Sequence, residues 1–145
     1  MLISFIAKGV AERLEPKDSV AMISIIEPDE EVRLKDGWKH LLSLRFHDVD
    51  TKNKLPIITA SGVEKITPTV FDKVMAGQII DFIKNLPENI RAVTVHCHGG
   101  ISRSSAVAKF LAEEIYNADF PKDYSLYNRK VYSTLMDVYH NQKSY

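Results

Sequence analysis

Arg91–Ala108 reads RAVTVHCHGGISRSSAVA, and this stretch decides the fold. Its first part is apolar and rich in β-branched residues, which predicts a buried strand that ends at His96. The segment Ala106–Tyr116 predicts a helix. A tight loop that opens a helix directs several backbone N–H groups at one point, where the helix dipole adds about half a positive charge. The stretch therefore predicts a strand, an anion-binding loop and a helix.

Two side chains give this loop its chemistry. Cys97 is the only cysteine of the chain, and Arg103 follows six residues later, at the start of the helix. A thiol that faces N–H groups, a helix N-terminus and a guanidinium is expected to have a pKa lowered from about 8.5 to roughly 3.5–7.5. The guanidinium can hold two phosphate oxygens at once. Gly99 and Gly100 allow positive φ angles and a close approach to an anion. The loop pairs a nucleophile with a phosphate-binding group.

The segment His96–Ser104 resembles the signature HCxxGxxR[S/T] of the cysteine-based protein tyrosine phosphatases. The strand before it and the helix after it also match that family. The resemblance implies one α/β phosphatase domain over residues 1–145, with a mainly parallel sheet of four to five strands and helices on both faces. The chain is far shorter than the receptor-type members and lacks their phosphotyrosine-recognition loop. It is therefore most similar to the compact dual-specificity type.

The remaining residues of the active site are inferred from the same resemblance. Compact phosphatases carry an aspartate shortly after a strand, often as Phe-x-Asp, and Phe46–Asp48 matches that arrangement. A proton delivered to the leaving oxygen typically accelerates such a reaction about 10²–10⁴-fold. Asp48 is therefore the predicted general acid. Asp50 is the reserve, because it lies on the same loop, and His47 is expected to face solvent.

The resemblance implies hydrolysis of a phosphomonoester through a phosphocysteine on Cys97. Arg103 and the loop N–H groups would hold the phosphate, Ser104 would donate a hydrogen bond to the sulfur, and His96 would orient the loop. The loop residues expected to contact the phosphate are His98, Gly99, Gly100, Ile101 and Ser102. None of them is a lysine, which disfavours a phosphoinositide substrate. No metal or other cofactor is required by this chemistry.

The rest of the chain predicts alternating strands and helices, with right-handed crossovers and a parallel sheet. Ligands of such sheets bind beyond the carboxyl ends of the strands, so the loop 47–56 is expected to reach Cys97. The acidic run Glu27–Glu31 is interpreted as a solvated loop. The predicted strands are Leu2–Ala7, Ser19–Ile26, His40–Phe46 and, more weakly supported, Ile57–Ala60. The predicted helices are Val10–Leu14, Pro68–Leu86 and one within Ser125–Asn141, for which Asn128 is a candidate N-cap.

The composition limits the partners and the compartment. Nineteen basic and nineteen acidic residues among 145 cancel, which argues against nucleic acid and membrane surfaces as partners. A single cysteine suits a reducing compartment, and Met1–Ala7 is too short for a membrane span and lacks signal-peptide flanks. We therefore expect a cytoplasmic protein, by default a monomer. The family resemblance implies that it is an enzyme acting on a phosphorylated protein. Phosphotyrosine is the expected target, with phosphoserine and phosphothreonine left open.

Several alternatives stay open at this point. A non-catalytic module could keep the phosphate loop without turnover. An RNA or nucleotide 5′-phosphatase of the same fold is a second alternative, although the neutral net charge disfavours it. Rhodanese-like sulfur transferases and arsenate reductases also use a cysteine loop, but arsenate reduction generally relies on further thiols. A metal site built from His96, Cys97 and His98 is disfavoured because the chain has no second cysteine.

Overall fold

A central parallel sheet organises the chain. The computed structural model describes residues 1–50, 55–59 and 62–143. Within these residues, four strands pair in the order β1-β6-β2-β3, and all three pairings are parallel. The strands are β1 (Leu2–Ala7), β2 (Val20–Ile26), β3 (Leu41–Arg45) and β6 (Ala92–Cys97). The structure thus confirms the predicted α/β class and the parallel sheet.

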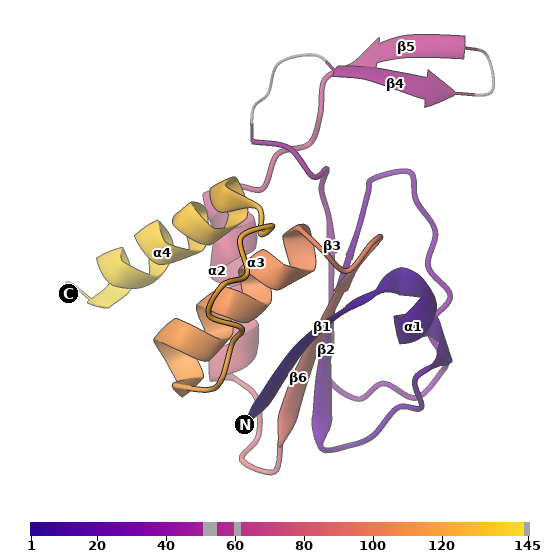
Figure 1. Ribbon diagram of the computed structural model, residues 1–145. Helices are drawn as coiled ribbons and strands as arrows, with labels where there is room; N and C mark the ends of the chain where they lie inside the picture. Colours follow the sequence, from indigo (N-terminus) through magenta and orange to yellow (C-terminus); the bar gives the residue numbers. More distant parts are fainter. Residues whose placement is uncertain (51–54, 60–61, 144–145) are drawn as a thin grey trace.

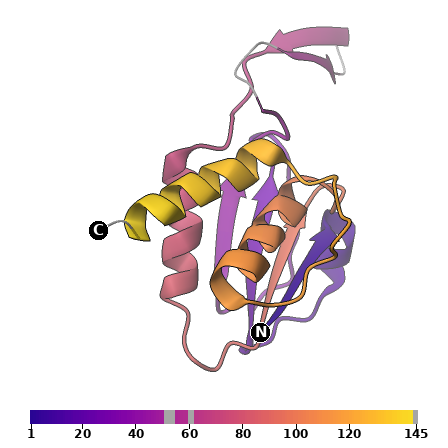
Figure 2. The ribbon, with the colours of Figure 1, turned by 60° about the vertical axis from the view of Figure 1, so that its left-hand side comes forward.

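Helices cover both faces of this sheet (Figures 1 and 2). In the described part of the chain, α2 (Lys73–Lys84), α3 (Arg103–Phe110) and α4 (Arg129–Lys143) pack on one face, and α1 (Lys8–Arg13) lies on the other. A π-helical turn, η1 (Leu111–Tyr116), continues α3. None of the helices that the structure describes is long and apolar enough to cross a membrane.

The two inner strands, β2 and β6, are continuously apolar in sequence rather than alternating because helices cover both faces of the sheet. A strand covered on both faces buries every side chain, and Ile23, Ile25, Val93 and Val95 are fully buried. The polar exceptions are paired across strands. His96 lies opposite Ser24 in the register, and their side chains are 2.6 Å apart (Nε2 to Oγ). The core therefore continues up to the end of β6, where Cys97 stands.

Helix α2 begins later than the predicted Pro68, and this prediction is wrong. The helix starts at Lys73, where the Asp72 side chain accepts a hydrogen bond from the Met75 N–H at 2.9 Å. The preceding residues are held in an extended conformation by another segment, because Thr69 uses both its N–H and its carbonyl to bond His47. Thr69 is therefore unavailable for a first helical turn, and the chain turns only after the buried Phe71.

A β-hairpin projects from the body of the domain (Figure 1). It consists of β4 (Leu55–Thr59) and β5 (Gly62–Ile66), which pair antiparallel and form a sheet of their own. The predicted extra strand Ile57–Ala60 overlaps β4, and Ala60 lies outside the described residues. The sequence analysis did not predict the partner strand β5. The hairpin is inserted between the loop that follows β3 and helix α2, so it adjoins the segment that carries Asp48.

Candidate active site

The loop 98–102 joins the end of β6 to the start of α3, at the carboxyl edge of the sheet. Gly100 has a φ angle of 68°, and a Cβ atom there would lie 2.4 Å from the Ala7 nitrogen and 2.5 Å from the Ile6 carbonyl carbon. Both are backbone atoms, which cannot move aside as a flexible side chain could, so only glycine fits. Gly99 has no positive φ angle, so the positive φ angle predicted for it is wrong.

The carbonyl groups of this loop are turned outward and bonded to the rest of the protein. The His98 carbonyl accepts the Lys8 N–H at 3.2 Å, the Ile101 carbonyl accepts the Ser105 hydroxyl at 2.5 Å, and the Ser102 carbonyl accepts the Asn128 N–H at 2.9 Å. With these three carbonyls bonded elsewhere, the backbone N–H groups of Gly100 and Ser104 form hydrogen bonds with the Cys97 sulfur. Such a concave ring of N–H groups at a helix N-terminus is an anion-binding arrangement.

Cys97 lies at the base of this ring, with 2% of its surface exposed. Burial by itself raises the pKa of its thiol, but hydrogen bonds from the Ser104 side chain and N–H, the Arg103 charge and the Gly100 N–H outweigh burial and lower the pKa. The Cys97 sulfur and the Ser104 hydroxyl oxygen are 3.1 Å apart. The sequence-predicted partners of the sulfur are therefore brought together around it.

Arg103 is also buried, with 4% exposure. Its Nη1 atom donates a hydrogen bond to the Phe46 carbonyl at 2.9 Å, which fixes the plane of the guanidinium. Its Nε atom is buried and has no hydrogen-bond partner within the described residues. A buried donor without a partner is costly and therefore rare. Arg103 is also one of the residues that line the cavity above Cys97.

The cavity has a volume of about 330 Å³. Its lining residues are Glu27, Asp48, Cys97, His98, Gly99, Ile101, Ser102 and Arg103. Asp48 reaches it from the loop after β3, and its Oδ1 atom accepts hydrogen bonds from the Ser102 hydroxyl and the Asn128 amide, each at 2.8 Å. Its Oδ2 atom makes no hydrogen bond within the described residues, so this oxygen is the one that can exchange a proton.

Asp50, the reserve acid, lines a different cavity. That neighbouring cavity has a volume of about 400 Å³ and also contacts Asp48 and Asn128. The structure therefore places Asp48, and not Asp50, beside Cys97. His47 does not face solvent as predicted: it is half-buried, and its Nδ1 atom accepts the Thr69 N–H at 2.8 Å. This hydrogen bond anchors the loop that carries Asp48.

Asn128 is a site residue whose contact with Asp48 the sequence analysis missed. Its side-chain oxygen accepts the Val131 N–H at 3.0 Å, which makes it the N-cap of α4, as the sequence suggested. The amide nitrogen of the same side chain bonds Asp48, and the backbone N–H bonds Ser102. One residue thus connects the final helix, the anion-binding loop and the acid. An asparagine that precedes a helical pattern signals the cap, but nothing in the sequence signals the other two contacts.

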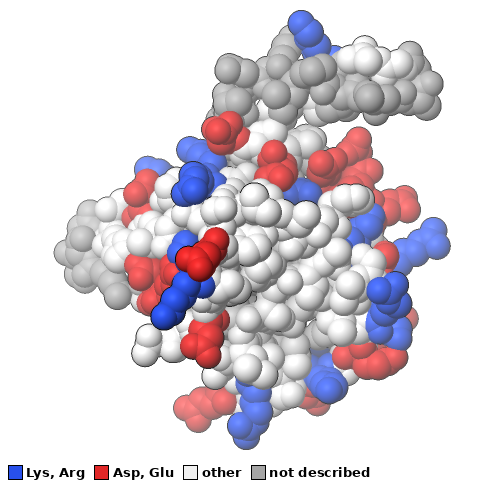
Figure 3. Space-filling view, in the orientation of Figure 1, with Lys and Arg blue, Asp and Glu red and all other residues white. Residues whose placement is uncertain are grey.

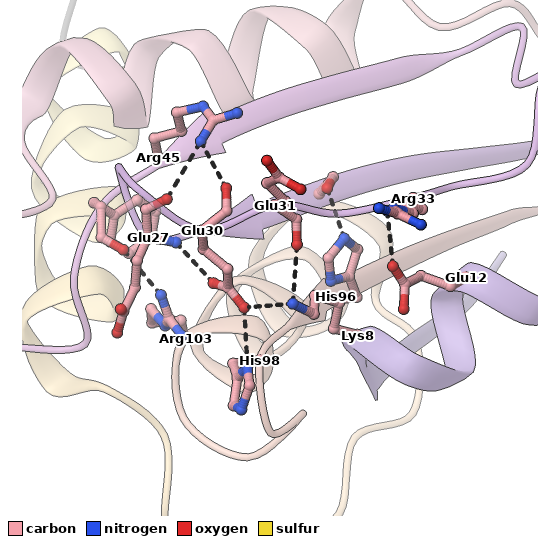
Figure 4. Close-up of polar contacts among 12 residues, drawn as sticks. Lys8, Glu12, Glu27, Glu30, Glu31, Arg33, Arg45, His96, His98 and Arg103 are labelled. Carbon is pink, nitrogen blue, oxygen red and sulfur yellow. Dashed lines mark hydrogen bonds and ion pairs between the residues drawn. The ribbon is translucent and has the colours of Figure 1, made fainter. Parts of the chain in front are cut away.

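The acidic run Glu27–Glu31 was interpreted as a solvated loop, and this interpretation is wrong for Glu30. Its side chain is only 12% exposed, and its carboxylate bonds Lys8 at 3.0 Å, His98 at 2.9 Å and the Glu27 N–H at 2.9 Å (Figure 4). Burial raises the pKa of this carboxyl, but the three donors outweigh it and lower the pKa to about 2. Glu30 therefore ties the anion-binding loop, through His98, to the loop after β2.

His96 is fully buried and lies behind the cavity rather than in it. Burial lowers the pKa of its imidazole below the ordinary value, which favours the neutral ring. Its Nε2 atom is bonded to Ser24. These contacts leave His96 a structural position between β2 and β6, directly before the nucleophile.

The comparisons with known proteins identify no relative of this chain. No protein-family model matches it, and no curated protein is similar enough to count as a match. The assignment of a function therefore rests on the geometry of the site and on the resemblance of His96–Ser104 to the phosphatase signature.

Proposed function

We propose that this chain is a cysteine-dependent phosphomonoesterase of the protein tyrosine or dual-specificity phosphatase type. One arrangement carries the proposal: a buried thiol with a lowered pKa, the open Nε donor of Arg103 and the carboxyl of Asp48 share a single cavity. A nucleophile, an anion-binding group and a proton donor are the three functions that phosphoryl transfer to cysteine requires.

The substrate phosphate binds to the inward-facing N–H groups of the loop and to Arg103. Because Nη1 is already bonded to Phe46, the Nε edge of the guanidinium is the one that meets the phosphate oxygens. These donors are held in place before substrate arrives, so they stabilise the charge that spreads over the equatorial oxygens in the transition state.

In the first step, the Cys97 thiolate attacks phosphorus from the base of the cavity. The S–P bond forms as the P–O bond to the leaving group breaks, and Asp48 transfers a proton from Oδ2 to the leaving oxygen. In the second step, Asp48 accepts a proton from water as that water attacks the phosphocysteine. Ser104 then stabilises the departing thiolate through the contact of 3.1 Å.

The mouth of the cavity supports a peptide or aryl leaving group. Ile101 lines the cavity and exposes 51% of its surface, so it offers an apolar contact beside the phosphate-binding loop. An aromatic ring of phosphotyrosine could cover this side chain while its phosphate reaches Cys97. This argument favours phosphotyrosine over a smaller phosphorylated side chain.

Hydrolysis of p-nitrophenyl phosphate by the purified protein and by Cys97→Ser tests the proposal. The wild type is expected to turn over the substrate, and the variant to lose turnover while it still binds phosphate or tungstate, measured by calorimetry. Turnover by the variant at the wild-type rate would overturn the assignment of the nucleophile. Anion binding without any turnover by the wild type would instead establish a non-catalytic phosphate-binding module.

A further inference from the structure

One carboxylate in the cavity is not explained by the mechanism. Glu27 directly follows β2 and lines the cavity together with Cys97 and Arg103. Its carboxylate makes no hydrogen bond and no ion pair within the described residues, although its backbone N–H and carbonyl are both bonded. The carboxylate of Glu30, three residues later, is fully occupied by three donors. Glu27 is therefore a half-buried acidic side chain whose carboxylate has no ion-pair partner among the described residues.

Its surroundings strengthen the negative charge at the mouth. Acidic side chains gather along the upper edge of the molecule, below the hairpin (Figure 3). Ligand atoms of Glu27, Asp29 and His47 lie within 4.8 Å of one another, and Asp48 lines the same cavity as Glu27. The Asp29 carboxylate likewise has no hydrogen bond or ion pair within the described residues.

Three basic side chains near this edge have partners other than the Glu27 carboxylate among the described residues. Lys8 and His98 bond Glu30, and Arg45 donates to the backbone carbonyl of Glu27 at 3.4 Å (Figure 4). Arg45 donates to the Pro28 carbonyl as well, at 3.1 Å. Arg45 also donates to the Glu30 carbonyl at 3.0 Å. Among the described residues that line the cavity, the guanidinium of Arg103 is therefore accompanied by two carboxyl groups, those of Glu27 and Asp48.

A metal ion is a poor candidate to neutralise this mouth. Because the His47 Nδ1 atom accepts the Thr69 N–H, the ring proton lies on Nε2. Neither ring nitrogen then offers a free lone pair to a metal, and only the carboxylates of Glu27 and Asp29 are left. An organic cation needs nothing more than these oxygens, since an ammonium or guanidinium brings its own N–H donors.

We propose that Glu27 is a specificity-determining residue that receives a lysine or arginine side chain next to the phosphorylated residue of a peptide substrate. This inference rests on the proposed phosphatase function and names the substrate class. In such a substrate the phosphate would bind Arg103 and the loop 98–102, and the neighbouring cation would bind the carboxylate of Glu27. A polyanion such as nucleic acid brings further phosphates to the negative mouth and is repelled.

The test compares three phosphotyrosine peptides that differ only in the residue beside phosphotyrosine, which is lysine, glutamine or glutamate. The kcat/KM of each is measured at low and high salt, with EDTA present, on the wild type, Glu27→Gln and the control Glu88→Gln. Glu88 is exposed in the loop before β6, at the opposite end of that strand from Cys97.

The wild type and Glu88→Gln are expected to prefer the lysine peptide over the glutamate peptide about tenfold at low salt, and less at high salt, because partly exposed charges are screened. In Glu27→Gln, the ratio of kcat/KM for the lysine peptide to kcat/KM for the glutamate peptide is expected to be smaller than in the wild type by a factor of about three. The ratio within one variant does not depend on its overall activity or on the fraction that is folded.

Equal kcat/KM for the three peptides on an active wild type would overturn this inference and leave the phosphatase function intact. A lysine preference that Glu27→Gln retains in full would overturn the assignment to Glu27. Failure of the wild type to hydrolyse any peptide or aryl phosphate would overturn the proposed function itself.

Discussion

The side chain of Asn128 donates its amide to Oδ1 of Asp48 at 2.8 Å and accepts the Val131 N–H with its oxygen at 3.0 Å. The oxygen of the Asn128 amide thus caps helix α4, and the nitrogen of the same amide holds the Asp48 carboxylate. The two functions are separable by mutation, because each uses a different atom of the side chain.

Asn128→Asp is expected to keep the cap and to impair catalysis. Aspartate caps helices about as well as asparagine, so the melting temperature should change little, whereas a second carboxylate beside Asp48 removes a donor and adds repulsion. Asn128→Ala loses both contacts and should cost about 1 kcal/mol of stability as well. Thermal unfolding and kcat for p-nitrophenyl phosphate measure the two effects. Equal kcat in Asn128→Asp and the wild type would contradict the orienting role.

Asp48→Asn should reduce kcat about 10²-fold or more for a phosphate ester with a poor leaving group, because no proton is delivered to the departing oxygen. The loss should be smaller for p-nitrophenyl phosphate, whose leaving group is stable as an anion. Asp50→Asn is the matched control, since Asp50 lies on the same loop but outside the Cys97 cavity. A larger loss in Asp50→Asn than in Asp48→Asn would reassign the acid.

Gly100→Ala should destabilise the fold by about 2–5 kcal/mol, from the positive φ angle together with the clash of the added methyl group with the backbone of β1. Gly99→Ala is the control within the same loop, because its nearest neighbour would be a side-chain carbon of Ile101 at 3.7 Å, an ordinary contact. Urea unfolding of both variants measures the difference. Similar losses of unfolding free energy in the two variants would show that the loop does not require glycine at position 100 in particular.

Glu30 should make the stability depend on pH in the acidic range. Its carboxyl has a pKa of about 2 in the folded protein against an ordinary value of 4.5, so its contribution is fully present above pH 4.5 and is lost as the pH falls toward 2. At neutral pH, Glu30→Gln should cost roughly 1 kcal/mol. The difference in melting temperature between the wild type and the variant should shrink as the pH falls through this window. A difference that stays constant down to pH 2 would refute this linkage.

Alkylation of Cys97 by iodoacetamide should follow a titration midpoint below that of a free thiol, because Ser104, Arg103 and the Gly100 N–H favour the thiolate. Ser104→Ala should move the midpoint upward, since it removes the hydroxyl 3.1 Å from the sulfur. Vanadate should protect the wild type from alkylation. An ordinary midpoint without such protection would count against an activated nucleophile.

The fold was largely predictable because its strongest signals are local. Continuous apolar runs predicted the inner strands, and the segment after Cys97 predicted the loop and helix that follow. The start of α2 was mispredicted, because the contact of Thr69 with His47 spans 22 residues and overrides a good local helix signal. The β4–β5 hairpin was only half predicted, since the pairing partner of β4 has no strong apolar pattern.

In the candidate site, too, contacts between residues close in sequence were predictable and contacts between distant residues were not. Cys97 and Arg103 are close in sequence, so their positions in one loop predicted their proximity, whereas the contact of Ser104 with the sulfur was expected from the family resemblance. Asp48 was placed with the help of a family resemblance. The Asn128–Asp48 contact crosses 80 residues and the Glu30–His98 contact 68, and neither pairing leaves a pattern in the sequence. Only the packing of the loops at the edge of the sheet brings these side chains together.

The hydrogen bond from Arg103 to the Phe46 carbonyl joins two parts of the candidate site. Phe46 is two residues before Asp48, so the guanidinium is bonded to the segment that carries the predicted acid. In the proposed mechanism, the group that binds the phosphate and the group that donates the proton are therefore mechanically coupled. A substitution that displaces one of them is expected to disturb the other.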